Sequence, residues 1–160
     1  MPKDSGETSV GAVAPDFDLP TDGGGRLRLS ELRARKVVLY FYPADDTEGC
    51  TLEAVNFTAL LPEFKRAGTT VVGVSPDSPK SHDRFKEKHA LKLLLAADAD
   101  HQVIERYGLW GEKTMFGRKY MGVERATCLI DRLGRIAQVW RKVRVKGHAE
   151  AVLAAAKALY

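Results

Sequence analysis

Residues 37–42 read VVLYFY, six consecutive apolar residues rich in β-branched and aromatic side chains. A run of this length and composition is typical of a central strand that is covered on both faces. Pro43 ends the run, and a loop with two aspartates leads to Cys50, where a helical pattern begins and continues to about residue 67. The stretch therefore predicts a buried strand, a loop and a helix, the unit from which α/β folds are built.

Strands and helices alternate along the rest of the chain. The hydrophobic periodicity predicts an extended segment at 14–19, strands at 26–29, 69–74, 93–95, 123–130 and 135–143, and helices at 78–89, 100–107 and 146–160. This order describes an α/β fold with a mixed central sheet flanked by helices, in which the parallel part is wound first and the antiparallel edge last. We expect residues 1–9 to form a disordered tail and residues 10–160 to form one domain.

The composition is that of a soluble globular protein. The chain has 160 residues, of which 44% are hydrophobic and 29% charged. It contains no apolar run of the roughly 18 residues that a membrane helix needs, and its first residues lack the apolar core of a signal peptide. Two cysteines cannot form a disulfide framework, and four scattered histidines do not form a zinc motif. We therefore expect a cytoplasmic protein with reduced thiols and with no bound metal or cofactor.

Positive charge is concentrated in the last third of the chain. Residues 1–100 contain 13 lysines and arginines against 16 acidic residues, whereas residues 101–160 contain 12 against 5. A basic surface of this kind can bind nucleic acid or an acidic protein. No nucleic-acid-binding motif accompanies the charge, so we interpret it as a solvated surface.

The position of Cys50 indicates chemistry. Catalytic groups of α/β folds gather at the carboxyl ends of strands, where the loop before Cys50 lies. Cys50 also opens a helix, whose unpaired N–H groups and positive dipole end stabilise a thiolate. Thr47, one helical turn earlier, can place its hydroxyl against the sulfur, and Gly49 lets another molecule approach the backbone closely. A free cysteine is often a small buried residue, but the polar residues 45–48 argue against burial here, and we predict a reactive thiol.

Residues 41–53, FYPADDTEGCTLE, closely resemble the active-site segment of peroxiredoxins and are most similar to their bacterioferritin comigratory (Q-type) subfamily. The resemblance continues in APDF at 14–17, GVSPDS at 73–78 and RATCLID at 125–131, so it spans nearly the whole chain from about residue 11. It implies a thioredoxin-like fold. It also implies a thiol-dependent peroxidase that reduces hydrogen peroxide and organic hydroperoxides in antioxidant defence.

The resemblance further implies roles for individual residues. Cys50 is the expected peroxidatic nucleophile, which is oxidised to a sulfenic acid, and Thr47 is expected to hydrogen-bond the thiolate and the peroxide. Pro43 is expected to shield the sulfur from water, and Arg125 to hold the thiolate and polarise the O–O bond. Displacement at oxygen requires an ionised sulfur, donors near the leaving oxygen and the exclusion of water. Glu53, one turn after Cys50, either orients Arg125 or the loop, or complements the helix dipole.

The second cysteine bears on how such an enzyme is recycled. Many Q-type peroxiredoxins carry a resolving cysteine five residues after the peroxidatic one, where this chain has Val55, and others carry it on the following helix, where residues 78–89 contain none. Only Cys128 remains. Side chains alternate along a strand, so Cys128 points away from the site if Arg125 points toward it. We expect Cys128 to be a buried core thiol rather than the resolving residue.

Two other functions fit part of the sequence. A thioredoxin-type disulfide oxidoreductase needs a second cysteine three residues after Cys50, and Glu53 occupies that position. A non-catalytic binding module would use the basic last third of the chain to hold nucleic acid or a client protein. Peroxide consumption that depends on Cys50 separates an enzyme from such a module. The leading expectation is a monomeric peroxidase whose partners are a hydroperoxide and an external reductant, a thioredoxin, a glutaredoxin or a small thiol.

Overall fold

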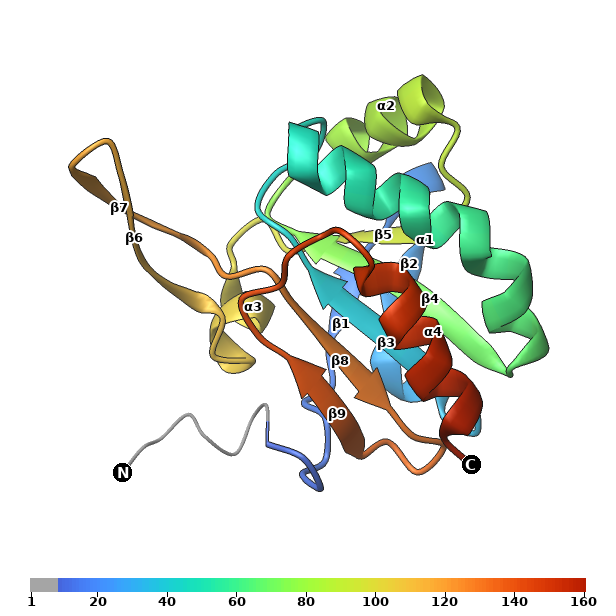
Figure 1. The fold of residues 1–160 in the computed structure, drawn as a ribbon. Helices are drawn as coiled ribbons and strands as arrows, with labels where there is room; N and C mark the ends of the chain where they lie inside the picture. The colour runs from blue at the N-terminus through green and yellow to red at the C-terminus, as the bar shows by residue number, and fades with distance from the viewer. Residues whose placement is uncertain (1–8) are drawn as a thin grey trace.

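The computed structural model describes residues 9–160, and its central feature is a five-stranded mixed sheet (Figure 1). The strands, in their order across the sheet, are β5 (Leu94–Ala97), β4 (Thr69–Ser75), β3 (Lys36–Phe41), β8 (Ala126–Ile130) and β9 (Ile136–Trp140). β3, β4 and β5 pair in parallel, whereas β8 and β9 are antiparallel. The predicted mixed sheet, with its antiparallel edge last in sequence, is confirmed. Of the tail expected at residues 1–9, all but Ser9 lies outside the described residues.

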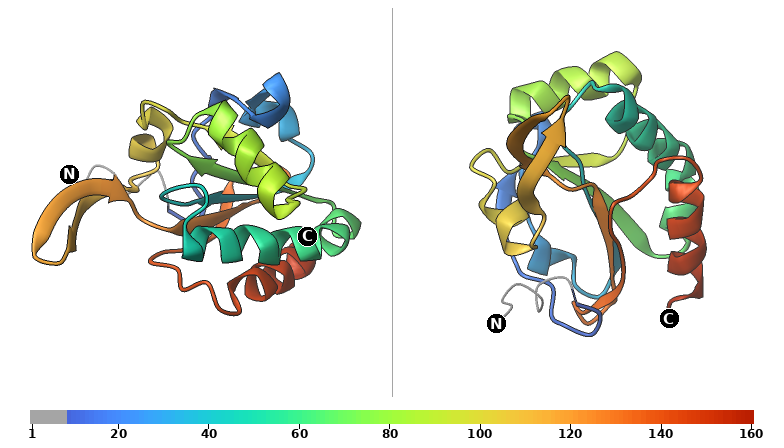
Figure 2. Two further views of the ribbon diagram at one scale, coloured as in Figure 1. Left: turned by 90° about the horizontal axis from the view of Figure 1, so that it is seen from above. Right: turned by 60° about the vertical axis from the view of Figure 1, so that its left-hand side comes forward.

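Two apolar cores lie on the two faces of this sheet. Helices α1 (Glu48–Arg66), α2 (Pro79–His89) and α4 (His148–Ala158) cover the helix-side core, and the opposite core is covered by α3 (Gln102–Arg106), by β1 (Asp18–Pro20) and β2 (Arg26–Arg28), and by the 3-10 helix η3 (Leu29–Leu32) (Figure 2). A second 3-10 helix, η2 (Asp22–Gly24), joins β1 to β2. Residues of β3 alternate between the two cores, with Val38 and Tyr40 on the helix side and Leu39 on the other. All six residues of β3 are buried, as the apolar run predicts.

The strand predicted at 123–130 is wrong in one respect that affects the site. A preceding strand ends at Val123 and β8 begins at Ala126, so Glu124 and Arg125 form a connection between strands. The backbone groups of Glu124 and Arg125 form hydrogen bonds with residues outside the five-stranded sheet. The Glu124 N–H donates to the Leu109 carbonyl at 2.8 Å, and the Arg125 carbonyl accepts from Val143 at 3.0 Å. The last strand and the last helix are also shorter than predicted, ending at Trp140 and beginning at His148 respectively.

A hairpin that the periodicity did not predict projects from the body of the molecule (Figures 1 and 2). It consists of β6 (Trp110–Met115) and β7 (Arg118–Val123), which pair only with each other. Phe116 and Gly117 at its turn both have left-handed backbones, with φ of 52° and 76°, as a type I′ turn requires. Most of its residues are partly or fully exposed, so no buried face imposes the alternation by which strands are recognised.

Within the described residues, no helix is long and apolar enough to cross a bilayer.

Candidate active site

Cys50 lies in the first turn of α1, after the loop that leaves β3. The helix begins at Glu48 with Thr47 as its N-cap residue, and the N–H groups of this turn have no acceptor within the helix. Cys50 is nevertheless only 1% exposed and packs in the helix-side core. The expectation that polar neighbours keep Cys50 out of a core is therefore wrong. Residues 46–48 stay at the surface, whereas Cys50 faces the sheet against which α1 packs.

Arg125 contacts the sulfur from the connection before β8. Its Nη2 lies 3.5 Å from Cys50 Sγ, and its Nη1 donates a hydrogen bond of 2.7 Å to Glu53 Oε1. A guanidinium is permanently charged and presents donors in a fixed plane. The Arg125 side chain is mostly buried, at 18% exposure, so water screens its charge only weakly. The arrangement holds a fixed positive charge in contact with the Cys50 thiol.

Glu53 lies one turn after Cys50 and is 1% exposed. Burial raises the pKa of its carboxyl group to about 7, although the neighbouring Arg125 acts in the opposite direction. Its Oε2 has no hydrogen-bond partner among the described residues. The sequence left two interpretations of Glu53 open, and the ion pair with Arg125 is the contact that the structure contains.

Gly49 and Thr47 make contacts within the chain that bear on their expected roles. A Cβ atom at Gly49 would lie 3.2 Å from Nη2 of Arg125, so the group that approaches this glycine is the guanidinium of the same chain. The Thr47 hydroxyl donates to the Ala44 carbonyl at 2.8 Å. A hydroxyl has one proton, so the expected donation from Thr47 to the sulfur is not made in this structure. The lone pairs of Thr47 can still accept a hydrogen bond from a ligand.

A cleft of about 530 Å³ opens beside Arg125. Pro43 lies on its wall, and much of the remaining lining comes from the hairpin, including Trp110, Lys113 and Thr114. The cleft therefore extends from Pro43 and Arg125 to the projecting hairpin, and Cys50 itself does not line it. Within residues 9–160, no group of three or more His, Cys, Asp or Glu side chains is placed to hold a metal ion.

Comparison with known proteins identifies the family. Residues 10–139 match the AhpC/TSA family. The chain is 49% identical over 144 residues to a putative peroxiredoxin Bcp of Coxiella burnetii, which covers 90% of this chain and 95% of that protein. It is 46% identical over 139 residues to the peroxiredoxin Bcp of Bacillus subtilis, with 87% and 88% covered. The chain is a peroxiredoxin of the AhpC/TSA family.

Solved structures support the same identification. A structure of Xanthomonas campestris peroxiredoxin Q superposes on this peroxiredoxin with a TM-score of 0.85 at 45% identity, over 89% of this chain and 90% of that one. The thioredoxin-like fold and the bacterioferritin comigratory (Q-type) subfamily, which the motifs implied, are thereby confirmed. This peroxiredoxin is an enzyme, a thiol-dependent peroxidase with an antioxidant function. The interpretation as a non-catalytic binding module is therefore set aside.

Cys128, the second thiol of this peroxiredoxin, lies on β8 and packs in the core opposite to that of Cys50. The sheet separates the two thiols, although Arg125, from which the alternation of side chains was counted, lies outside β8. Cys128 is fully buried, and burial raises its pKa to about 12. Both cysteines are free thiols.

Two features of the site were missed in the sequence. The hairpin wall of the cleft was left unassigned, because its turn, Phe116 and Gly117, is not one of the Asn-Gly or Asp-Gly pairs by which a two-residue hairpin turn is recognised. The second is a buried polar network around Asp45 in the loop before Cys50. Its sequence signal is weak, because an aspartate in a loop is usually a turn residue.

Proposed function

We propose that Cys50 is the peroxidatic nucleophile, and that the enzyme reduces hydrogen peroxide and organic hydroperoxides through a sulfenic acid on this residue. The observation that supports this most directly is the Arg125 guanidinium 3.5 Å from the sulfur, at the positive end of α1. The thiolate attacks one peroxide oxygen, an S–O bond forms and the O–O bond breaks. The departing oxygen takes up a proton and leaves as water or an alcohol, while Cys50 is oxidised to the sulfenic acid.

In this proposal Arg125 acts both before the thiolate attacks and in the transition state. It favours the thiolate before attack, and it stabilises the negative charge that develops on the leaving oxygen. Glu53 fixes the plane of the guanidinium through the 2.7 Å bond, so little reorganisation is needed during the reaction. Gly49 provides the space in which the guanidinium lies, because any larger side chain would press on Nη2.

Thr47 and Pro43 complete the proposed site. Since the Thr47 proton is committed to Ala44, its oxygen is free to accept the O–H of a peroxide and so orient it toward Cys50. Pro43, on the wall of the cleft, limits the access of water to the sulfur. The cleft beside Arg125, of about 530 Å³, is larger than hydrogen peroxide requires, which supports organic hydroperoxides as further substrates. The bacterioferritin comigratory protein of Xanthomonas campestris is described as having alkyl peroxide reduction activity.

For recycling, we propose that an external thiol reduces the sulfenic acid. Attack by that thiol releases water and forms a mixed disulfide, which a second thiol then opens. A disulfide requires Cα atoms within about 7 Å, and the position of Cys128 beneath the other face of the sheet argues against it as the partner of Cys50. Thioredoxin, glutaredoxin and small thiols are the candidate reductants. Because these reductants keep thiols reduced in the cytoplasm, we propose that the enzyme works there, and that it does so as a monomer.

Intact-mass spectrometry after one equivalent of peroxide tests the proposal. The expected product carries one added oxygen, or one thiol adduct when a small thiol is included, and peptide mapping places the change on Cys50. Loss of two hydrogens from the monomer, with a Cys50–Cys128 crosslink, would instead show that Cys128 is the resolving residue.

A further inference from the structure

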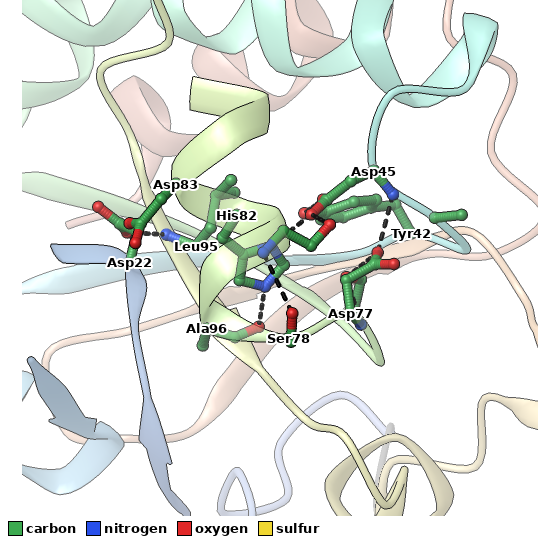
Figure 3. A network of polar contacts seen from close by, with 12 residues as sticks. Asp22, Tyr42, Asp45, Asp77, Ser78, His82, Asp83, Leu95 and Ala96 are labelled. Atoms are coloured by element: carbon green, nitrogen blue, oxygen red, sulfur yellow. Dashed lines mark hydrogen bonds and ion pairs between the residues drawn. The ribbon is translucent and has the colours of Figure 1, made fainter. Parts of the chain in front are cut away.

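A buried polar network holds the loop that leads to Cys50 (Figure 3). Its centre is Asp45, whose side chain is 4% exposed. Asp45 Oδ1 accepts from the Tyr42 hydroxyl at 2.6 Å, and Oδ2 accepts from the Ser81 hydroxyl at 2.7 Å and from His82 Nδ1 at 2.8 Å. The Asp45 N–H donates to Asp77 Oδ2 at 2.8 Å. At this single residue the loop is thus bonded to Tyr42, which follows β3, to α2, and to Asp77 in the connection after β4.

His82 is the fully buried member of this network, and both of its ring nitrogens face acceptors. Nδ1 lies 2.8 Å from the Asp45 carboxylate, and Nε2 lies 3.1 Å from the Ala96 carbonyl on β5. Burial alone would raise the pKa of Asp45, but the hydrogen bonds from His82, Tyr42 and Ser81 lower it, so the carboxylate is ionised and only accepts. A carbonyl oxygen also only accepts. Both contacts are therefore hydrogen bonds only if His82 carries a proton on each nitrogen.

We propose that His82, as an imidazolium, is a positioning residue of the peroxidase reaction. It ties Asp45 to β5 and so holds the loop in the shape that places Cys50 at the start of α1 beside Arg125. The proposal rests on Cys50 being the peroxidatic residue, as proposed above. His82 does not touch the sulfur, and it acts through Asp45 and the five residues that follow it.

The charged and titratable groups around His82 leave Asp45 as its partner. Those on the neighbouring elements have partners of their own: Tyr42 bonds Asp45, Asp77 accepts from Ser75 and Asp45, Asp22 pairs with Lys86, Asp83 accepts from Gly23, and Asp98 accepts from Val103 and Ile104. One residue further along the loop, Asp46 pairs at the surface with Lys88 and His89 of the same helix. Helix α2 therefore contacts the loop at two places, at Asp45 in the interior and at Asp46 on the surface. Only the interior contact depends on a charge that water does not screen.

A neutral His82 has one N–H group and can donate only one of the two hydrogen bonds, so the loop would be released from either the Asp45 carboxylate or β5.

Two substitutions separate the two bonds. In His82→Asn the amide nitrogen replaces Nδ1 and keeps the bond to Asp45, whereas in His82→Gln it replaces Nε2 and keeps only the bond to Ala96. We expect His82→Gln to slow oxidation of Cys50 by about tenfold, the factor for one charge-assisted hydrogen bond, and His82→Asn, which loses only the weaker bond to a neutral carbonyl, to slow it by about threefold. Glu87→Gln, at an exposed position of α2, is the matched control and should oxidise at the wild-type rate.

Equal rates in the Asn and Gln variants, or a wild-type rate in His82→Gln, would overturn the proposal. If either variant does not fold, ¹⁵N NMR of the wild type decides: both ring nitrogens of His82 should carry protons at neutral pH, and one unprotonated nitrogen contradicts the imidazolium. Cys50→Ser is measured in parallel. Peroxide consumption by Cys50→Ser would refute the proposed function itself. If Cys50→Ser is inactive but His82→Gln is oxidised at the wild-type rate, only the positioning role of His82 is refuted.

Discussion

Replacing Arg125 with methionine removes the positive charge from Cys50 while keeping a side chain of comparable length. The variant should fold, because Glu53 can take up a proton when its partner is lost. Burial already raises the pKa of Glu53 to about 7, and Arg125 is the group that opposes this rise. Without Arg125 the buried carboxyl group is neutral at pH 7 and leaves no uncompensated charge.

The magnitude follows from the 3.5 Å separation between Nη2 and Sγ. At that distance, and with an effective dielectric constant of about 20, a guanidinium and a thiolate attract each other by about 5 kcal/mol. Only part of this attraction is lost in the transition state, because the charge moves from the sulfur toward a leaving oxygen. A loss of about 3 kcal/mol is the usual cost of removing one such donor, and it corresponds to about a hundredfold in rate.

The assay is a single turnover with one equivalent of peroxide, quenched at intervals and analysed for oxidised Cys50 by mass spectrometry. Arg84→Met removes an exposed cation from α2 and serves as the control for net charge. Oxidation of a folded Arg125→Met protein within about threefold of the wild-type rate would refute the role assigned to this arginine, since it would leave under a quarter of the expected effect.

Three further predictions concern the surroundings of the thiol. Gly49→Ala should slow oxidation of Cys50 by about tenfold by pressing on the Arg125 guanidinium, and the same single-turnover assay measures it. Glu53→Gln should remove a destabilisation that in the wild type grows as the pH rises from 4.5 to about 7, because the folded protein binds a proton that the unfolded chain has lost. The difference should reach roughly 3 kcal/mol above pH 7, and urea unfolding at acidic and alkaline pH should show it or its absence. Cys128→Ser should turn over normally with an external thiol but unfold at lower urea concentration, because it buries a hydroxyl group among apolar side chains.

The framework of the fold could be predicted because its strongest signals are local. The apolar run of β3 requires cover on both faces, and the structure buries all six of its residues. Cys50 could be singled out from its place between a strand and a helix. Cys128 was placed away from the site by counting alternate side chains from Arg125, and it does lie in the opposite core, although Arg125 itself lies outside β8. These inferences depend on period and order along the chain, and tertiary packing did not override them.

What could not be predicted depends on contacts between distant segments. Polar residues before Cys50 predicted an exposed thiol, yet the packing of α1 on the sheet buries it. Arg125 was assigned to a strand, whereas it lies in the connection before β8, where bonds to Leu109 and Val143 fix the backbone. The partner of the Thr47 hydroxyl is set by the fold of the loop rather than by spacing along the helix.

The central claim is that Cys50 carries the peroxidase chemistry, and the most direct measurement is peroxide consumption by Cys50→Ser compared with Cys128→Ser under one external thiol. Serine is close to cysteine in size, but its hydroxyl stays protonated at neutral pH, so Cys50→Ser should remain folded and consume no peroxide above background. Cys128→Ser should consume peroxide at the wild-type rate. Activity near that of the wild type in Cys50→Ser would contradict the account.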